Sequence, residues 1–482
     1  MAKGTTFLSG FVDFSKKKQA GVSSPAALPE PHISERNISH NNSPHIHNGI
    51  KNETDNNQGK FRSDIATQLI RKHHYILVQE QLWAYNSNRG CFEILGNVAL
   101  RHQVELAINN HQKNSSYLTQ SIIDEISRRQ YVENYVFNSN KYLLNFKDCV
   151  YDIENNEIYH HNHDYGFNYV LNAEIYESED LSSFTVDKFI DSLCGGKKKK
   201  RKRLQEMCGV LISGIFFKGA IFFIGKHDTG KSTLARLLRH LVGVNQVSSV
   251  SLEVIHKNFT LSQMRNKRLN IAGEVSRNVK PIQFKIFKEI TGGDSVFVDI
   301  KNKEPQSVTF TAKQLFLGNF LPDFPADDDS LYDRFNVIYF NNTIPREERD
   351  PNLFDKLIEN IDYFALWCLK GLRRYIKNNN CFTEDDDSND YFMCHIEKSN
   401  SSMAFIQKFI IKGNDNEFIT NSELYELYVR FCHENTLAVH SRQKLFSNIQ
   451  EIFPQSKRGR EYVDKERPQV IHGIKIYRED IL

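Results

Sequence analysis

The apolar residues between positions 221 and 241 follow two different spacings in succession. Ile221–Ile224 is a continuous run of β-favouring residues, which is typical of a parallel strand buried on both faces. After a short loop, leucines recur every three or four residues from Leu234 to Leu241, as they do on one face of a helix. The pattern predicts a strand, a loop and a helix near the middle of the chain.

The sequence before this unit mixes helical and alternating patterns, which predicts an α/β accessory domain. Its expected helices lie at 62–69, 104–108 and 121–129. Its expected short strands lie at 75–78, 82–85 and 91–94. The stretch 140–160 predicts a β-hairpin that turns at Glu154–Asn156.

Three further strands and a second hairpin are predicted after the helix. The strands are Lys267–Glu274, Leu315–Asn319 and Val337–Phe340. A helix over 282–290 should stop at Gly292–Gly293, because glycine tolerates the left-handed backbone of a helix end. A hairpin should then carry Val296, Val298 and Ile300 on one face.

The C-terminal part begins with a long amphipathic stretch over 353–376, which predicts helical structure that covers the nucleotide-binding domain. An acidic segment at 384–390 is expected to be a linker. Three helices then precede a basic turn at Lys457–Arg460 and strands at 470–477, with Thr420 and Ser441 as suitable N-caps. This order suggests a winged-helix-like domain. Arg442 and Lys444 on its third helix would face a DNA groove, or the domain would contact protein instead.

The patterns together divide the chain into five parts. They are a disordered tail (1–58), an α/β accessory domain (59–195), a nucleotide-binding domain (196–380), a linker (381–402) and a winged-helix-like domain (403–482).

Composition places the chain among globular proteins and leaves nucleic-acid binding to local clusters. It has 482 residues, 40% hydrophobic and 25% charged, with a net charge of +3. Eight cysteines show no C-x-x-C spacing, which argues against a zinc or disulfide framework. No apolar run has membrane-spanning length, and the N-terminus lacks a signal sequence. We expect a cytoplasmic protein of the host, or a nuclear one if the host is eukaryotic.

The loop between the first strand and helix fits G-x-x-x-x-G-K-[ST], the pattern of a phosphate-binding loop. Glycines let several backbone N–H groups face one anion, and the helix N-terminus adds positive charge. Lys231 would reach the β- and γ-phosphates of ATP, and Ser232 would hold Mg²⁺. The expected nucleotide-binding residues are Gly225, Lys226, His227, Asp228, Thr229, Gly230, Lys231, Ser232 and Thr233.

Polar residues follow the next strands in an order that suits ATP hydrolysis. Glu274 would hold Mg²⁺ or polarise the attacking water, and Asn319 would bond the γ-phosphate or that water. Arg334 precedes a strand, which suits an arginine finger supplied to the nucleotide of a neighbouring subunit.

Two stretches of basic residues are candidates for DNA contact. Lys301 and Lys303 lie near the tip of the second hairpin, where they would track a phosphate backbone. The run Lys197–Arg203 has three interpretations: a solvated helix end, a nucleic-acid contact or a nuclear targeting signal.

The tail is poor in large apolar residues except at Thr5–Phe14, which precedes Lys16–Lys18. The apolar piece would dock on a replication partner such as a primase, polymerase or clamp, or it is a fraying terminus.

These motifs together resemble the superfamily 3 helicases, especially the phage/plasmid and poxvirus-type primase–helicases. The resemblance rests on the loop from Gly225, on K-E-I-T-G-G-D at 288–294 and on L-F-L-G-N-F-L-P at 315–322. It also rests on Lys301–Lys303, on Asp333–Phe335 and on the stretch from Tyr142. It covers 142–340 well and the C-terminus more loosely. It implies an AAA+ fold, a hexameric ring, Mg-ATP hydrolysis between subunits and 3′-to-5′ movement on single-stranded DNA.

The chain departs from this family in two places. The family's second motif often ends in two acids, whereas Gly273 precedes Glu274 here, so Glu274 serves the metal, the water or both. The Asp-x-Asp pattern of a polymerase-type primase is missing from 61–193, which suggests a helicase without its own primase.

The sequence therefore predicts a ring-forming, ATP-hydrolysing DNA helicase that replicates a virus, phage or mobile element. A second hypothesis is a non-translocating P-loop ATPase that loads or remodels a replication initiator. A third is an adaptor whose tail and C-terminal domain matter more than ATP turnover.

Overall fold

The structure is a computed structural model, and it describes residues 53–108, 115–175, 182–301, 304–324, 329–414, 417–462 and 466–477. The chain separates into two compact units, Met1–Asn57 and Gln58–Leu482. The apolar piece of the tail and Lys303 lie outside the described residues. In the described part of the chain, no helix is both long and apolar enough to cross a membrane.

A five-stranded sheet forms the centre of the larger unit. Its strand order is β13-β7-β12-β9-β8, and every neighbouring pair is parallel. The strands are β7 (Ala220–Gly225), β8 (Val247–Ser248), β9 (Leu269–Ala272), β12 (Lys313–Gly318) and β13 (Phe335–Phe340). The strands expected within the nucleotide-binding domain are therefore confirmed, although β9 ends two residues before Glu274.

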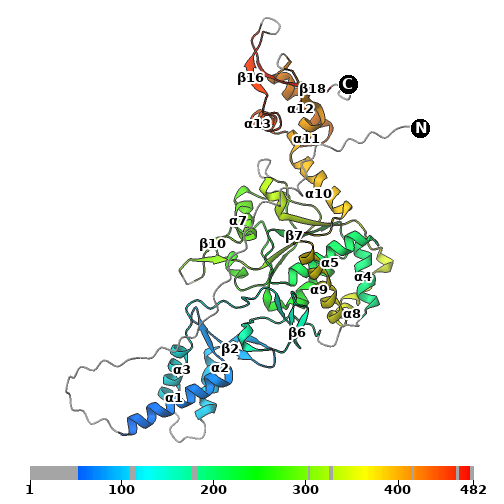
Figure 1. The fold of residues 1–482 in the computed structure, drawn as a ribbon. Coiled ribbons are helices and arrows are strands. Elements are labelled where there is room, and N and C mark those ends of the chain that lie inside the picture. Colours follow the sequence, from blue (N-terminus) through cyan, green and yellow to red (C-terminus); the bar gives the residue numbers. More distant parts are fainter. Residues whose placement is uncertain are drawn as a thin grey trace, which may run out of the picture. The chain divides into compact units, whose positions relative to one another are not determined.

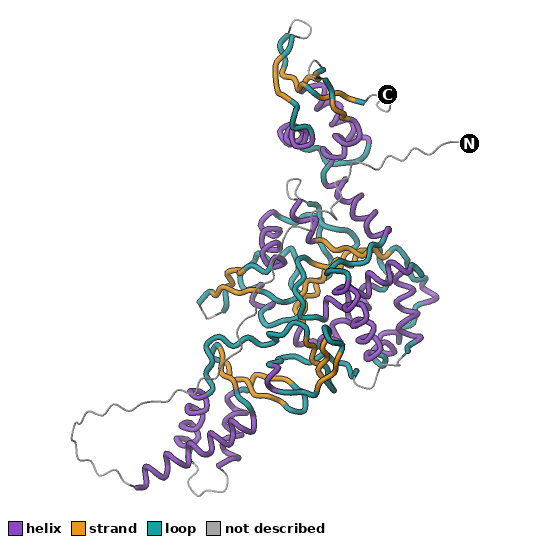
Figure 2. The backbone as a smooth tube through the Cα atoms, in the orientation of Figure 1, coloured by secondary structure: helices purple, strands orange, loops and turns teal. Residues whose placement is uncertain are grey.

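The side chains of β7 alternate between two hydrophobic cores, one on each face of the sheet. Ile221 and Phe223 belong to the core that includes α5 (Lys198–Ile212), α6 (Lys231–Val242) and α9 (Ile361–Lys377). Phe222 and Ile224 belong to the core that includes α7 (Pro281–Gly292). Figures 1 and 2 show helices on both sides of the strands. Burial on both faces explains why this strand is apolar throughout instead of alternating with polar residues.

Among the described residues before the central sheet, the first elements are three antiparallel strands and three helices. The sheet contains β1 (Ile76–Val78), β2 (Gln81–Asn86) and β3 (Cys91–Ile94). The helices are α1 (Glu53–His73), α2 (Asn97–Ile108) and α3 (Ser116–Arg129). A second small sheet has the order β4-β5-β6, and its strands are Leu143–Asn145, Val150–Asp152 and Glu157–Tyr159. The expected turn at Glu154–Asn156 is confirmed, because it joins β5 to β6.

The second hairpin is also present, with β10 (Ser295–Val298) paired to β11 (Gln306–Thr309). The preceding helix α7 ends at the predicted glycines, and Gly293 has the left-handed φ of +82°. The helical structure expected over 353–376 is confirmed, and it consists of two helices. The stretch forms α8 (Leu353–Ile358) and α9, with Glu359 and Asn360 between them.

The C-terminal region contains three helices and two small sheets. The helices are α11 (Ser401–Phe409), α12 (Asn421–Glu434) and α13 (Arg442–Ile452). One sheet pairs β14 (Ile410–Lys412) with β18 (Ile474–Ile476), and the other joins β15 (Phe418–Thr420), β16 (Lys457–Arg460) and β17 (Gln469–His472). The predicted caps are confirmed, because the hydroxyls of Thr420 and Ser441 accept hydrogen bonds from the first turns of α12 and α13. The basic turn is wrong, since Lys457–Arg460 is a strand.

The acidic segment expected as a linker instead forms the N-cap and the first five residues of a helix, α10 (Asp386–Ser399). Asp385 caps it by accepting a hydrogen bond from the backbone N–H of Ser388. The hydroxyl of Ser388 accepts a hydrogen bond of 2.9 Å from the backbone N–H of Tyr339, which attaches the start of α10 to β13. Sequence reasoning missed this helix because its first turn is acidic rather than apolar. Asp386 and Asp387 favour a helix N-terminus through the helix dipole.

Another helix that precedes the loop between β7 and α6 in the chain also contacts this loop. This helix, α4 (Phe184–Cys194), is capped by Ser183 and ends at Gly195, which has φ +58°. It packs against α5 and contributes Phe189 and Leu193 to the same core as α6. It therefore supports the loop from the side opposite the sheet, since the Leu193 side chain lies next to Gly230.

Candidate nucleotide-binding site

The loop between β7 and α6 has the backbone conformation that its glycines predict. A Cβ atom at Gly225 would lie 2.3 Å from the carbonyl oxygen of Phe340, so no other residue fits without moving β13. Asp228 and Gly230 have left-handed φ values of +61° and +85°. The chain therefore turns sharply and enters α6 at Lys231, with the helix N-terminus facing the loop.

The Lys231 ammonium lies against this loop and reaches the neighbouring strand. Its Nζ donates hydrogen bonds of 2.8 Å to the Gly225 carbonyl and 2.7 Å to the Lys226 carbonyl. A third bond, of 3.3 Å, goes to Oδ1 of Asn319. Desolvation lowers the pKa of Lys231, and the nearby Asp228 carboxylate opposes this shift. The structure thus brings together two residues that lie 88 positions apart in the sequence.

Asn319 links the loop to the carboxyl end of β12. Its Nδ2 lies 3.2 Å from Nε2 of His227. Glu274 follows β9 at the same edge of the sheet, because Ala272 is paired with Phe316 of β12. It is exposed and has a left-handed φ of +51°, which is uncommon outside glycine. Among the described residues, Glu274 has no hydrogen-bond or ion-pair partner.

Ser232 and Glu274 offer oxygen ligands, which suit Mg²⁺. Ser232 is exposed in the first turn of α6. In the described ranges, no group of three His, Cys, Asp or Glu residues is arranged to hold a metal by itself. This donor set fits a Mg²⁺ ion that takes only one or two protein ligands and the rest from phosphates and water.

Arg334 lies at the opposite ends of the strands from the loop. Phe335, which follows it, is paired with Ala220, whereas Phe340 is paired with Gly225. Five strand residues at 3.3 Å each put Arg334 about 16 Å from its own loop. Its Nη1 donates a hydrogen bond of 2.5 Å to the Ser330 carbonyl, and its buried Nε has no partner among the described residues. Within one chain, the structure does not bring Arg334 to the nucleotide site.

The hairpin with the candidate DNA-binding lysines is anchored by its apolar face. Val296 and Val298 are buried in a small core, and Ile300 packs against it. Phe297, on the other face, is 74% exposed. Lys301 is exposed at the hairpin tip.

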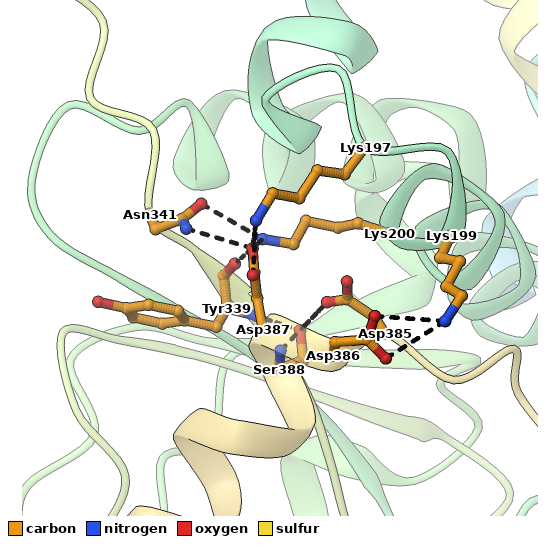
Figure 3. Close-up of polar contacts among 9 residues, drawn as sticks. All are labelled: Lys197, Lys199, Lys200, Tyr339, Asn341, Asp385, Asp386, Asp387 and Ser388. Carbon is orange, nitrogen blue, oxygen red and sulfur yellow. Dashed lines mark hydrogen bonds and ion pairs between the residues drawn. The ribbon is translucent and has the colours of Figure 1, made fainter. Parts of the chain in front are cut away.

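The basic run Lys197–Arg203 is paired with carboxylates of the same chain, which none of the three sequence interpretations anticipated. Figure 3 shows Lys197, Lys199 and Lys200 facing the start of α10. Nζ atoms of Lys197 and Lys200 lie 2.6 and 2.7 Å from Asp387, and that of Lys199 lies 3.2 Å from Asp386.

The Lys200 side chain is completely buried, which is rare for lysine. Its Nζ also donates a hydrogen bond of 2.8 Å to the Tyr339 carbonyl and one of 3.3 Å to Oδ1 of Asn341. Hydrogen bonds from Lys197 and Lys200 lower the pKa of Asp387 to about 2. These contacts join α5, α10 and the end of β13, the strand that flanks the nucleotide loop.

A cavity beside the loop was missed by sequence reasoning. It has a volume of about 880 Å³, and Asp228, Gly230 and Thr233 line it together with Phe184. Phe184 is 82% exposed although it is a large apolar residue. Arg349 closes one side through an ion pair of 3.0 Å with Asp228. No local pattern identifies these residues, because the cavity forms only where α4, α8 and the chain after β13 meet.

Two regions of the chain match known protein families. Residues 50–195 match the family described as "D5 N terminal like". Residues 223–334, from within β7 to Arg334, match the "Family of unknown function (DUF5906)".

A curated relative and two solved structures are also similar. "Putative helicase 121R" of Invertebrate iridescent virus 3 is 25% identical over 173 residues, which are 34% of this chain and 18% of that protein. The chain therefore spans less than a fifth of the length of this relative. Two apo structures of the NrS-1 C-terminal region align with TM-scores of 0.51 and 0.52 at 14% identity. Each alignment covers 85% of this chain and 98% of the other. The latter likeness shows a shared fold.

The comparisons agree with one another along the chain. The D5-like match covers the region before the nucleotide loop, and the structural likeness extends over most of the described residues. The sequence matches relate parts of this chain to the D5-like family and to a viral protein described as a putative helicase, and the structural likeness shows the fold.

Proposed function

We propose that this protein is an ATP-dependent replicative DNA helicase that moves along single-stranded DNA as a ring. The observation that carries the proposal is the contact of Lys231 with Asn319 at the carboxyl edge of the parallel sheet. A phosphate-binding loop next to a polar residue from the adjacent strand is what nucleotide hydrolysis needs at that edge. The strand order and the relationship to a viral helicase support the AAA+ and superfamily 3 assignment.

The residues of the loop divide the work of binding and hydrolysis. Backbone N–H groups of 226–230 and the N-terminus of α6 bind the phosphates of ATP, and Lys231 neutralises their charge. Ser232 and Glu274 would hold Mg²⁺, which when bound draws charge from the γ-phosphate. Asn319 orients the attacking water or the γ-phosphate. Glu274 follows the neighbouring strand β9 at the same carboxyl end of the sheet, where it would polarise that water.

The position of Arg334 favours a ring over a monomer. The nucleotide loop and Arg334 lie at opposite ends of the strands of one sheet, so an arginine finger must come from another copy of the chain. A contact between two different surfaces of identical subunits is head-to-tail, and such contacts form a ring when the rotation between subunits closes. We therefore propose a homo-hexamer with the nucleotide between subunits, as the resemblance implies.

DNA would enter this ring through the hairpin lysines. Lys301 is exposed at the tip, and the buried face of the strand ties the hairpin to its own subunit. The winged-helix-like C-terminal domain adds a second surface, for DNA or for a protein. The N-terminal tail would recruit a primase, polymerase or clamp.

The test is ATP hydrolysis and unwinding by the purified full chain. Lys231→Ala should abolish hydrolysis, because the phosphates lose their main side-chain counter-charge, while Lys370→Ala, an exposed lysine on α9, should not. Wild-type turnover by Lys231→Ala would refute the ATPase assignment. DNA-stimulated hydrolysis without unwinding of a forked duplex would favour the initiator-remodelling ATPase instead.

A further inference from the structure

A second cleft lies away from the nucleotide loop, between the N-terminal region and the amino ends of the central strands. Its volume is about 460 Å³. It is bordered by the start of the N-terminal sheet, the segment before β4, the approach to β9 and the end of β11. We call it the basic cleft, after the cations in its wall: Lys141, Arg265, Lys267 and Arg268.

The charge of the basic cleft is of one sign. Four cations line it, and none of the described residues in its wall is an Asp or Glu. Lys267 donates a hydrogen bond of 2.5 Å to the backbone carbonyl of Asn245, and Arg265 lies 3.5 Å from the side-chain oxygen of Gln79. Neither contact supplies a negative charge, so the cleft attracts anions.

Arg268 adds a cation inside the wall. Its guanidinium carbon lies 3.5 Å from the centroid of the Tyr169 ring, and one nitrogen donates to the Ile212 carbonyl. Its Nε is buried and has no partner among the described residues. Burial lowers the pKa of this group, and the nearby Tyr169 opposes the shift. An anion in the cleft would therefore relieve an uncompensated positive charge.

Part of the wall is aromatic: Trp83 and Phe310 are buried behind it, and Tyr135 and Phe137 are partly exposed. The Trp83 and Phe137 rings lie 4.6 Å apart, and Tyr135 lies 4.9 Å from Phe137 in an edge contact. Phe310 lines the cleft from the chain after β11, and Val136, at the rim, is 68% exposed. Cations beside aromatic rings are the combination that binds phosphates and unpaired bases at the same time.

The cleft is held in shape by hydrogen bonds between its two sides. Nδ2 of Asn138 donates a bond of 2.7 Å to Oδ1 of Asn168, and the Asn168 carbonyl accepts a bond of 3.0 Å from Gln246. Lys141 is packed against Gly214, because a Cβ atom added to Gly214 would lie 3.1 Å from the Cα atom of Lys141. A preformed cleft loses less conformational entropy on binding than a mobile segment.

The position of the cleft connects it to the proposed translocation hairpin. Val308 and Thr309 of β11 belong both to the hairpin and to the cleft wall. Arg268 and Lys313 both lie at the amino ends of the central strands, because the Lys313 N–H donates a hydrogen bond to the Arg268 carbonyl. The cleft therefore lies at the base of the hairpin whose tip carries Lys301.

We propose that the basic cleft is a binding site for single-stranded nucleic acid. Lys141, Arg265 and Lys267 contact successive phosphates, and the partly exposed rings of Tyr135 and Phe137 receive one or two unstacked bases. The site extends the DNA path of the proposed function, but its binding step does not depend on ATP hydrolysis. A duplex is not its ligand, because paired bases have no free faces for the aromatic wall.

The test measures binding of labelled oligo-dT by the nucleotide-free full chain at several salt concentrations. Each phosphate contact contributes about 0.7 to the slope of log affinity against log salt for single strands. Lys141→Ala with Arg265→Ala should lower the slope by about 1.4, which weakens binding about 25-fold near 0.1 M salt. The matched control is Lys370→Ala with Lys377→Ala, two exposed lysines of α9, which should leave the slope unchanged.

A slope equal to that of the control overturns the proposal. Each single variant should lower the slope by about 0.7, so the prediction is testable even if the double variant folds poorly. The same measurements with oligo-U and with a duplex identify the ligand. Equal or tighter binding of oligo-U that the variants weaken assigns the cleft to RNA as well, and duplex binding that they weaken as much overturns the single-strand assignment.

The hairpin variant Lys301→Ala with Lys303→Ala separates this site from the proposed function. If only the hairpin variant lowers the slope, the cleft is not a nucleic-acid site and the helicase proposal stands. If only the cleft variant does so, the cleft is confirmed and the hairpin is not the DNA contact.

Discussion

Replacing Asp387 with Asn tests whether the buried Lys200 is held by charge. The change keeps the shape of the side chain and an oxygen that accepts hydrogen bonds, and removes only the negative charge facing Lys200. Lys200 is completely buried and Asp387 is 22% exposed, so the charge that remains in Asp387→Asn is shielded from water.

The magnitude follows from the pKa of Asp387. Hydrogen bonds from Lys197 and Lys200 lower it from 3.8 to about 2. A shift of one unit corresponds to about 1.4 kcal/mol, so the full shift corresponds to about 2.4 kcal/mol. Partial exposure reduces this figure, and we expect Asp387→Asn to lower the free energy of unfolding by about 2 kcal/mol. Asp387→Ala also removes the acceptor and should cost about 3 kcal/mol or more.

The matched control is Asp386→Asn in the same helical turn. Asp386 is 75% exposed and pairs with Lys199, which is 63% exposed, so this change should cost less than about 1 kcal/mol. Both variants alter the interaction with the helix dipole in the same way, and the difference between them isolates the buried pair.

Urea unfolding followed by tryptophan fluorescence measures the effect, because Trp367 lies on α9, which packs against α5. In a Lys200→Met background, Asp387→Asn should cost little, since no buried charge is left to balance. Equal losses in the two backgrounds, or equal losses for Asp386→Asn and Asp387→Asn, would refute the role of the buried charge.

The same pair predicts how stability depends on acidity. A carboxyl whose pKa is lower in the folded state stabilises the protein above its unfolded pKa. This contribution is present above pH 3.8 and is lost as the pH falls towards 2. Asp387→Asn should therefore flatten the stability profile in that window, and Asp386→Asn should not.

Two further predictions concern the motor. Arg334→Ala should bind ATP without hydrolysing it, and mixing it with Lys231→Ala should restore some hydrolysis at interfaces where an intact loop meets an intact arginine; no rescue in mixed rings shown to form would exclude an arginine finger. Lys301→Ala with Lys303→Ala should lower the salt slope of single-strand binding by about 1.4 and reduce fork unwinding far more than basal ATP hydrolysis. Normal unwinding by that variant would exclude the hairpin as the translocating element and favour the basic cleft or the C-terminal domain.

The sequence by itself determined the elements whose causes are local. A continuous apolar run is compatible only with burial on both faces, so β7 could be predicted from Ile221–Ile224 alone. The loop that follows depends on glycines at positions where a side chain would clash or strain the backbone, as at Gly225 and Gly230. Helix ends with a hydroxyl cap or a terminal glycine, such as those at Ser441 and Gly293, were also predictable.

Only the tertiary structure decided what the charged residues do. The run Lys197–Arg203 looks like an exposed basic segment because the carboxylate partners of Lys197, Lys199 and Lys200 lie about 190 positions away, at the start of α10. The acidic segment looks like a linker for the same reason. An ion pair depends on distance in space, and neither residue type nor spacing along the chain records it.

The same limit applies to sites that are assembled from several elements. Lys231 and Asn319 could each be assigned from the sequence, but the 3.3 Å contact between them exists because β7 and β12 are neighbours in the sheet. The strand register also showed that Arg334 lies at the amino ends of the central strands, away from the loop that follows β7. The basic cleft brings residues from Trp83 to Phe310 into one wall, and no pattern in the chain predicts that surface.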